Sequence, residues 1–316
     1  MVREPAQAVL LDAGRAGRRL VAVGERGVIA LSDDEGAHWR QARSPVSVTL
    51  TGVRFADPKH GWAVGHGGVV LASDDGGEHW SRRLDGRELA QIVLAAARKG
   101  GDTRAVRDAE RNLADGPDKP LLDLLLLGDQ RLLVVGAYGI AAASEDGGRT
   151  WDSWMARLPN PGGLHLYTAS RRGESLLLAG EQGLVLLSED GGRSFRRLET
   201  PYRGSFFAAE LLDYRDIVLA GLRGNVLRSI DAGASWSRVA TPMPASVTAT
   251  TIDGAGRLLA VNQAGFVLTL QGQQLLPLNR EPLPPLVDLL PDVDGRLLTL
   301  SVYGVIPLPA TPESTK

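Results

Sequence analysis

The chain has 316 residues, of which 43% are hydrophobic, so it can bury a large core as one repetitive domain or as two ordinary ones. Its formal net charge of −2 gives no basic surface for nucleic acid, and the absence of cysteine excludes disulfides, thiolate catalysis and cysteine-ligated metals. No segment reaches the ~18 uninterrupted apolar residues that cross a bilayer, so we expect a protein that does not itself span a membrane.

The N-terminal segment MVREPAQAVLLDAGRAG does not have the pattern of a signal peptide, because its apolar stretch is short and soon interrupted by charge and glycine. Either the protein is cytoplasmic or the sequence begins after a removed leader. The location of the protein therefore stays open at this point.

The first element along the chain is a turn that contains glycine and joins two apolar runs, as in VAVGERGVIALS at residues 21–32. The same frame returns throughout the chain, at a spacing of 41, 71, 44, 41, 41 and 39 residues. The glycines of the seven turns are Gly27, Gly68, Gly139, Gly183, Gly224, Gly265 and Gly304. A repeat of this period indicates a propeller or another repeat architecture.

A second phrase, SxDxGxxW, follows the glycine turn in the first five units, with phenylalanine in place of tryptophan in the fourth. Its members are Ser32, Asp34, Gly36, Trp39, Ser73, Asp75, Gly77, Trp80, Ser144, Asp146, Gly148, Trp151, Ser188, Asp190, Gly192, Phe195, Ser229, Asp231, Gly233 and Trp236. A regular unit contains four short strands, most clearly VTLTGVRFA, GWAVGH, VVLASD and HWSRRL in the second. We therefore predict one all-β domain over residues 1–316, a seven-bladed β-propeller of four-stranded antiparallel blades.

One interval is longer than the others by roughly 30 residues, and the extra residues follow the second SxDxGxxW phrase. Apolar residues recur there with helical spacing, and Gly100 and Gly101 interrupt the pattern. We predict a helical hairpin over 86–99 and 103–115, within an insertion of about 84–117. Four exposed arginines are candidates for contacts with acidic partner segments, although a solvated decoration would explain them equally well: Arg87, Arg98, Arg104 and Arg107.

The last unit has only three strands in its sequence, so an edge would stay open if nothing else paired with it. We expect residues near Val2 to Pro5 to supply the missing outer strand.

The SxDxGxxW phrase has a structural interpretation and a chemical one. If the phrase forms the hairpin between the third and fourth strands, its carboxylate accepts loop N–H groups, its glycine allows the turn and its aromatic ring covers the hairpin. All of its residue types are then explained without a catalytic or metal-binding role. The five carboxylates then ring one end of the propeller and cannot converge on a substrate. His38 and His79 occupy the same position in their units, and we expect both to be exposed turn residues.

These residues resemble a known family. SxDxGxxW is similar to the Asp-box, or BNR, repeat of sialidases, other glycosidases and binding propellers. The wider frame, clearest in GWAVGHGGVVLASDDGGEHW, resembles the Ycf48 and HCF136 family over residues 7–308. The resemblance implies a seven-bladed propeller, and photosynthetic members of the family assist photosystem II assembly.

The composition, rich in arginine, alanine and leucine, fits the non-photosynthetic bacterial branch of the family better. Relatives in that branch are often encoded beside RND-type exporters. The resemblance therefore implies a non-catalytic, periplasmic or otherwise extracytoplasmic accessory or assembly factor, whose partner is an integral membrane protein or transporter complex.

The end opposite the Asp-boxes is formed by the turns between second and third strands and by the connections between blades; we call it the connection end. Its residues differ from blade to blade, as a specific partner surface requires. Our candidates for partner binding are Arg26, His66, Tyr138, Gln182, Tyr202, Arg203, Arg223, Gln263 and Tyr303. Ordinary exposed turn residues would also fit any one of these positions.

Two chemical alternatives remain. A sialidase-like glycosidase would need converging arginines, a tyrosine activated by a glutamate and a separate acid, for which Glu25 and Glu181 are the candidate glutamates. Calcium binding by the DDGG and EDGG turns would need stacked neighbouring turns, which a 41-residue period does not provide. No phosphate loop, zinc-protease motif or nucleophile elbow occurs, so we expect no cofactor, no metal and no enzymatic activity.

Overall fold

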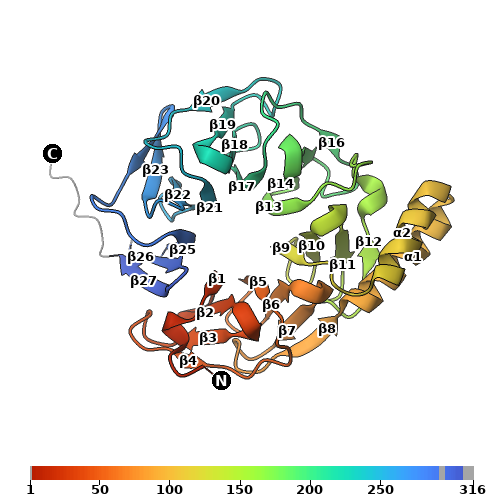
Figure 1. Ribbon diagram of the computed structural model, residues 1–316, viewed down its shortest axis with the longest axis horizontal. Helices are drawn as coiled ribbons and strands as arrows, with labels where there is room; N and C mark the ends of the chain where they lie inside the picture. The colour runs from red at the N-terminus through yellow and green to blue at the C-terminus, as the bar shows by residue number, and fades with distance from the viewer. Residues whose placement is uncertain (1, 292–295, 309–316) are drawn as a thin grey trace.

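The computed structural model describes residues 2–291 and 296–308. Seven antiparallel sheets surround a central axis as the blades of a propeller (Figure 1). Six blades have four strands in chain order and the seventh has three among the described residues. The predicted all-β, seven-bladed architecture is therefore confirmed.

The strands are short, and each blade runs from the central axis to the rim. The innermost strands are β1 (Leu10–Ala16), β5 (Leu50–Phe55), β9 (Leu121–Leu126), β13 (Leu166–Arg172), β17 (Phe206–Leu211), β21 (Val247–Ile252) and β25 (Leu286–Pro291). The second strands are β2 (Arg19–Gly24), β6 (Gly61–Gly65), β10 (Leu132–Gly136), β14 (Ser175–Gly180), β18 (Ile217–Gly221), β22 (Leu258–Asn262) and β26 (Leu297–Ser301).

The third strands are β3 (Ile29–Ser32), β7 (Val70–Ser73), β11 (Ala141–Ser144), β15 (Val185–Ser188), β19 (Val226–Ser229), β23 (Val267–Gln271) and β27 (Gly304–Leu308). The outer strands are β4 (Arg40–Gln41), β8 (Ser81–Leu84), β12 (Asp152–Ser153), β16 (Arg196–Arg197), β20 (Ser237–Val239) and β24 (Gln274–Pro277). Second and third strands are buried on both faces, which is why they read as apolar runs such as LVAVG and LLLAG. Seven apolar clusters fill the seven spaces between neighbouring blades.

Each Asp-box is a hydrogen-bonded hairpin between the third and the outer strand. In the third blade, Ser144 Oγ donates to Asp146 Oδ1 (2.8 Å) and accepts the backbone N–H of Gly148 (2.8 Å). Trp151 Nε1 donates to the carbonyl of Gly148 at 3.0 Å. Hydrogen bonds from Thr150, four residues after the aspartate, lower the pKa of Asp146 to about 2. The polar groups of the phrase are thus used inside the turn.

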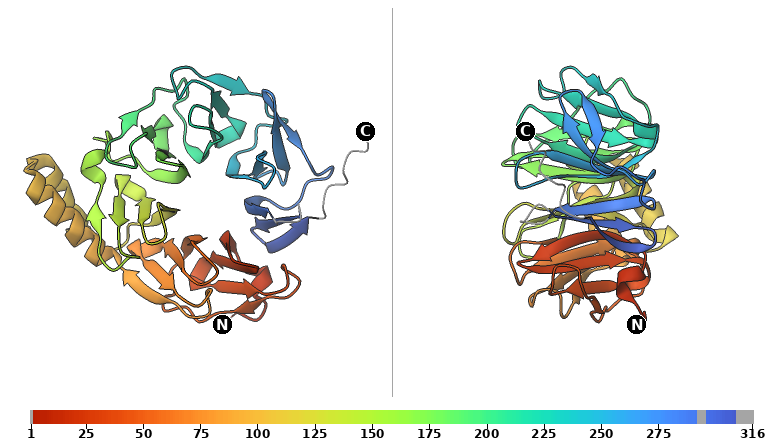
Figure 2. Two further views of the ribbon diagram at one scale, coloured as in Figure 1. Left: turned by 180° about the vertical axis from the view of Figure 1, so that it is seen from behind. Right: turned by 90° about the vertical axis from the view of Figure 1, so that its left-hand side faces the viewer.

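The insertion after the second Asp-box forms two helices, α1 (Gly86–Gly100) and α2 (Thr103–Asp115), at the predicted positions. Asp85 and Glu88 form a reciprocal capping box that starts α1. Leu89 of α1 packs into the apolar cluster between blades 2 and 3. The hairpin projects from the rim, outside the ring of blades (Figure 2).

The expected outer strand over Val2 to Pro5 is wrong. Residues 5–7 form a short 3₁₀ helix that contacts β27, β3 and β4, because proline fixes φ and has no N–H for a sheet ladder. The backbone N–H of Val2 donates instead to Oε1 of Gln41 in the first blade (2.7 Å). Blade 7 closes on blade 1 by sheet packing, in a cluster that includes Leu10, Ala13 and Leu300.

Side chains of the inner strands make a hydrogen bond across every junction between neighbouring blades. Asp12, Asp123 and Asp288 accept backbone N–H groups of the next inner strand, from Val53 (2.7 Å), Ala169 (2.9 Å) and Ala13 (3.2 Å). Thr51 and Thr248 donate to the carbonyls of Leu121 (2.8 Å) and Leu286 (3.0 Å). Ser170 accepts the N–H of Leu211 (3.3 Å), and Glu210 accepts from Thr250 (3.4 Å). We call these seven contacts the inner-strand bridges.

Charge is concentrated beside these bridges. Burial raises the pKa of Asp123, and burial together with the charge of Asp12 raises the pKa of Asp288 well above its usual range. Burial opposes the charge on Arg54, but the neighbouring Asp12, Asp123 and Asp288 outweigh that effect and raise its pKa. Burial also raises the pKa of Glu210, to about 7.

Replacing the Asp-box serine tests the hairpin. We expect Ser144→Ala to lower the free energy of unfolding by about 1–3 kcal/mol, because the buried N–H of Gly148 loses its acceptor. Urea denaturation measures the change. Ser81→Ala, on the exposed face of β8, is the control and should stay within about 0.5 kcal/mol of wild type. Equal effects of the two variants would contradict the role of the Asp-box serine.

Glu210 should make stability depend on pH. Because its folded-state pKa is about 7, above the ordinary 4.5, the folded protein keeps a proton that the unfolded chain loses. The free energy of unfolding should therefore fall as the pH rises from about 4.5 to about 7. In Glu210→Gln this loss of stability should be absent, so the variant should gain about 3 kcal/mol relative to wild type between pH 4.5 and 7, as urea denaturation at each pH would show. Parallel pH curves for the two proteins would contradict this prediction, and exposed Glu189→Gln is the control.

Candidate functional site

The connection end contains all nine residues that the sequence analysis selected for partner binding. Eight of them are exposed: Arg26, His66, Tyr138, Gln182, Arg203, Arg223, Gln263 and Tyr303. Tyr202 is half-buried, since its ring packs against Phe206 (5.4 Å between centroids) and its hydroxyl donates to the carbonyl of Leu222 at 3.4 Å. Tyr202 therefore joins a blade connection to the neighbouring turn.

The turns between second and third strands have a common backbone. In five blades the turn begins at a glycine, because a β-carbon at this position would collide with a backbone carbonyl of the connection that enters the blade. For Gly24, such a β-carbon would lie 2.0 Å from the carbonyl oxygen of Val9. Two positions later, four blades hold a non-glycine residue in the left-handed region: Arg26, Tyr138, Gln182 and Arg223, with φ of 53–57°. His66 and Gln263 stand one position earlier in their turns. Such a conformation costs roughly 1–2 kcal/mol per residue, so these side chains are present despite strain.

Aromatic rings of blades 3, 4 and 5 form a continuous row on this end. The ring centroids of Tyr138 and His165 are 5.1 Å apart, those of His165 and Tyr167 6.1 Å, and those of Tyr167 and Phe207 5.4 Å. The row begins in a turn of blade 3 and ends in the inner strand β17 of blade 5. We call these four residues the aromatic row.

Polar contacts fix the rings in place. Nδ1 of His165 accepts the backbone N–H of Tyr138 (3.1 Å) and lies 3.5 Å from Oε2 of Glu181. Burial, followed by the charge of Glu181, raises the pKa of Tyr167, so its hydroxyl stays neutral and can donate a hydrogen bond. The row is thus a rigid, largely uncharged surface.

A cation borders the row. Nζ of Lys119 lies 5.6 Å from the ring centroid of Tyr138 and 2.7 Å from Oδ1 of Asp118. The hydrogen bond to Asp118 raises the pKa of Lys119. The lysine therefore stays charged over the face of the tyrosine, where the cation is attracted to the ring.

Exposed apolar side chains gather on the same turns. Of the seven large hydrophobic residues that are exposed in the described part of the chain, four lie there: Tyr138, Leu222, Val302 and Tyr303. Tyr303 is 71% exposed and Tyr138 49%. This grouping favours the connection end as an interaction surface.

Sequence reasoning missed Leu222, Val302 and Lys119. Leu222 and Val302 directly precede the chosen residues Arg223 and Tyr303, so the turn alignment could have identified them. Lys119 follows the helical insertion and is buried beneath the ring of Tyr138, and nothing in the sequence places it beside that residue.

The arginines of the insertion divide into two kinds. Arg98 pairs with Glu110 (3.0 Å), and Arg104 lies 3.8 Å from Asp108. Arg87 and Arg107 are exposed. Acidic partners therefore compete with internal carboxylates at two of the four positions.

The two candidate glutamates of a glycosidase stand on different blades, Glu25 on the first and Glu181 on the fourth. Over residues 2–291 and 296–308, no three histidine or acidic side chains are grouped so that they could hold a metal ion. Neither helix in that part of the chain is long and apolar enough to cross a membrane.

Comparisons with known proteins agree with this architecture. A family model described as "Photosynthesis system II assembly factor YCF48" matches residues 19–103 and 111–281, which is more than half of the chain. No curated protein sequence matches the chain.

Solved structures share the fold at low identity. The structure "YCF48 bound to D1 peptide" is 15% identical, with a TM-score of 0.70 and coverage of 96% of this chain and 94% of that one. YCF48 from Cyanidioschyzon merolae is 17% identical, with a TM-score of 0.69 and coverage of 96% of both chains. A GH74 xyloglucanase from Xanthomonas campestris is also 17% identical, with a TM-score of 0.61 over 93% of this chain and 51% of its own.

The resemblance expected from the repeats is confirmed, and the comparison with the xyloglucanase indicates the propeller fold alone. The chain belongs to the family of the photosystem II assembly factor Ycf48.

Proposed function

We propose that the protein is a non-catalytic scaffold that binds another protein through its connection end and assists the assembly of a membrane protein complex. The observation that supports this most is the gathering of exposed apolar side chains on turns whose equivalent positions differ from blade to blade. Membership of an assembly-factor family points the same way.

A protein partner is supported by the structure of a Ycf48 bound to a D1 peptide. The partner surface should combine apolar side chains, which pack on the aromatic row and on Leu222, with carboxylates that meet Arg223 and Arg203. The exposed loops of a membrane protein complex can supply both.

We further propose that this complex is an RND-type transporter in a non-photosynthetic bacterium and that the protein acts in the periplasm. This part of the proposal rests on the composition of the chain and on the family resemblance. A photosystem II complex is the alternative partner within the family, and the identity of the captured protein decides between them.

Photo-crosslinking at matched tyrosines tests the surface. Tyr138 lies on the connection end, whereas Tyr214 lies on the Asp-box end and is similarly exposed, at 49% and 56%. With a photoreactive phenylalanine analogue at each position, we expect an adduct with an integral membrane protein from position 138 and none from position 214. Mass spectrometry identifies the adduct. Adducts formed chiefly from position 214 would place the partner surface at the other end.

The strained turns provide a second test. We expect Arg223→Gly to raise the free energy of unfolding by about 0.5–1 kcal/mol, because glycine adopts a positive φ without steric cost. The same variant should weaken the crosslink from position 138, since the arginine contributes to binding. Arg203→Gly, whose backbone has no positive φ, is the control and should lose about 0.4–1 kcal/mol in urea denaturation. A loss of stability in Arg223→Gly would show that the turn is not strained.

Catalysis is the outcome that would replace this proposal. Turnover of a fluorogenic sialoside by the purified protein, abolished by Glu181→Gln or Tyr138→Phe, would establish a glycosidase instead.

A further inference from the structure

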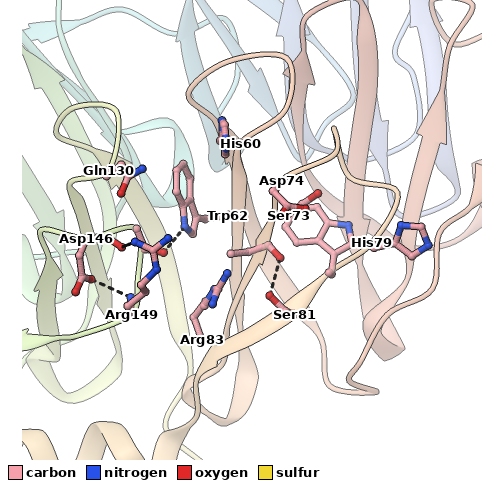
Figure 3. Close-up of a pocket in the computed structure, with 13 residues that line it drawn as sticks. His60, Trp62, Ser73, Asp74, His79, Ser81, Arg83, Gln130, Asp146 and Arg149 are labelled. Atoms are coloured by element: carbon pink, nitrogen blue, oxygen red, sulfur yellow. Dashed lines mark hydrogen bonds between the residues drawn. The ribbon is translucent and has the colours of Figure 1, made fainter.

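A cavity of about 340 Å³ lies between blades 2 and 3 at the Asp-box end, away from the connection end. Its wall includes Trp62, Asp74, Arg83, Gln130 and Arg149 (Figure 3). The volume lies at the lower end of the range for small-molecule sites, roughly 300–1,000 Å³. Because the cavity is separate from the partner surface at the connection end, a ligand site in it does not depend on the proposed function.

An inserted residue in the outer strand of blade 2 gives this junction its special form. Leu84 of β8 pairs with Val70 and Arg82 pairs with Leu71, so Arg83 is an extra residue in a β-bulge. In blades 3 and 4 the residue three positions after the Asp-box aromatic, Trp154 or Leu198, covers a glycine of the next Asp-box. In blade 2 that position holds Arg83, whose Cβ would lie 3.4 Å from a β-carbon on Gly148.

The bulge directs a charged side chain into the cavity. Figure 3 shows Arg83 rising between Trp62 and Ser81. The stem of Arg83 contacts the Asp-box turn of the next blade, whereas its guanidinium has no hydrogen-bond or ion-pair partner within the described residues. Arg83 is exposed and lines the cavity with no internal partner among the described residues, so its guanidinium is available for a ligand anion.

The other polar groups define what kind of anion fits. Arg149 contributes a second cation; among the described residues its Nη1 donates to the carbonyl of Asp146 alone, at 3.3 Å. The carboxylate of Asp146 is occupied by its own turn, whereas that of Asp74 has no partner among the described residues. Asp74 and Gln130 can accept hydrogen bonds from hydroxyl groups, and the negative charge of Asp74 disfavours a doubly charged phosphate.

We propose that this cavity binds a small monocarboxylate that carries hydroxyl groups, such as a uronic acid. Its carboxylate contacts Arg83 and Arg149, and its hydroxyl groups donate to Asp74 and Gln130. The indole nitrogen of Trp62 donates to the carbonyl of Gly147 (3.0 Å), so the ring is held as a rigid apolar wall beside the ligand.

Titration calorimetry with sodium D-glucuronate tests this proposal, with D-glucuronamide as the matched neutral ligand. We expect the amide to bind about tenfold more weakly than the acid, since it loses a charge-assisted contact. Arg83→Gln should weaken glucuronate binding about tenfold and leave amide binding nearly unchanged. Arg82→Gln is the control, because Arg82 is the neighbouring residue of the same strand and lies 3.4 Å from Asp85 instead.

Three results with the wild-type protein would overturn the proposal: equal affinity for acid and amide, tighter binding of inorganic phosphate, or no heat at ligand concentrations up to roughly 20 mM. Equal losses in Arg83→Gln and Arg82→Gln would also overturn it. If Arg83→Gln does not fold, as judged by its thermal melting curve, Arg149→Gln takes its place and should weaken glucuronate binding several-fold relative to wild type.

Discussion

Hydrogen bonds between neighbouring inner strands are the contacts on which the closed ring depends. The apolar surface buried between blades stabilises the ring, but this stabilisation is non-directional. It therefore does not by itself fix how far one sheet is shifted along the next. A bond that Asp12 accepts from the backbone N–H of Val53, or that Thr51 donates to the carbonyl of Leu121, fixes this shift at a particular atom. Because such a bond occurs at all seven junctions, the ends of the propeller are held in a defined arrangement.

The same bridges explain why the protein tolerates charge near its axis. A buried carboxylate loses hydration, and it is retained only where hydrogen bonds or an opposite charge compensate. Asp123 accepts two backbone N–H groups, and Arg54 lies between Asp12 and Asp123. Glu210 has no ion pair with an arginine among the described residues, and burial raises its pKa to about 7 although Ser170 and Thr250 donate hydrogen bonds to it.

Sequence reasoning succeeded where the interactions are local. The Asp-box is contained in eight consecutive residues and forms its bonds within them, so five copies predicted the blades and their polarity. The capped start of α1 at Asp85 is local in the same way. The prediction of an N-terminal strand failed because Pro5 cannot contribute a ladder N–H, a local constraint that outweighs the open edge of the last blade.

Contacts between units were not predictable. The aromatic row joins Tyr138 to Phe207, which are almost 70 residues apart in the sequence, and only the geometry of neighbouring blades brings the intervening rings together. The bridging carboxylates did leave a signal, since aspartate interrupts an apolar run at the same place in LLDAG, LLDLL and LVDLL. The bulge at Arg83 left no such signal in the sequence. The outer strand is short, so one extra residue in it does not produce a recognisable break in the alternation of side chains.

Blade 2 is where the repeat is least regular, and its irregularities are linked. Its outer strand is the longest of the first four blades, contains the bulge and leads directly into the helical insertion. Leu84 occupies the pairing position that Leu198 and Trp154 hold elsewhere, and it packs under Leu89 of α1. Leu84 must face inward to pack against the helix. The bulge that allows this directs its extra residue, Arg83, toward blade 3. One insertion thereby alters both ends of the same junction: it brings Lys119 to Tyr138 at the connection end and leaves an arginine in the cavity at the Asp-box end.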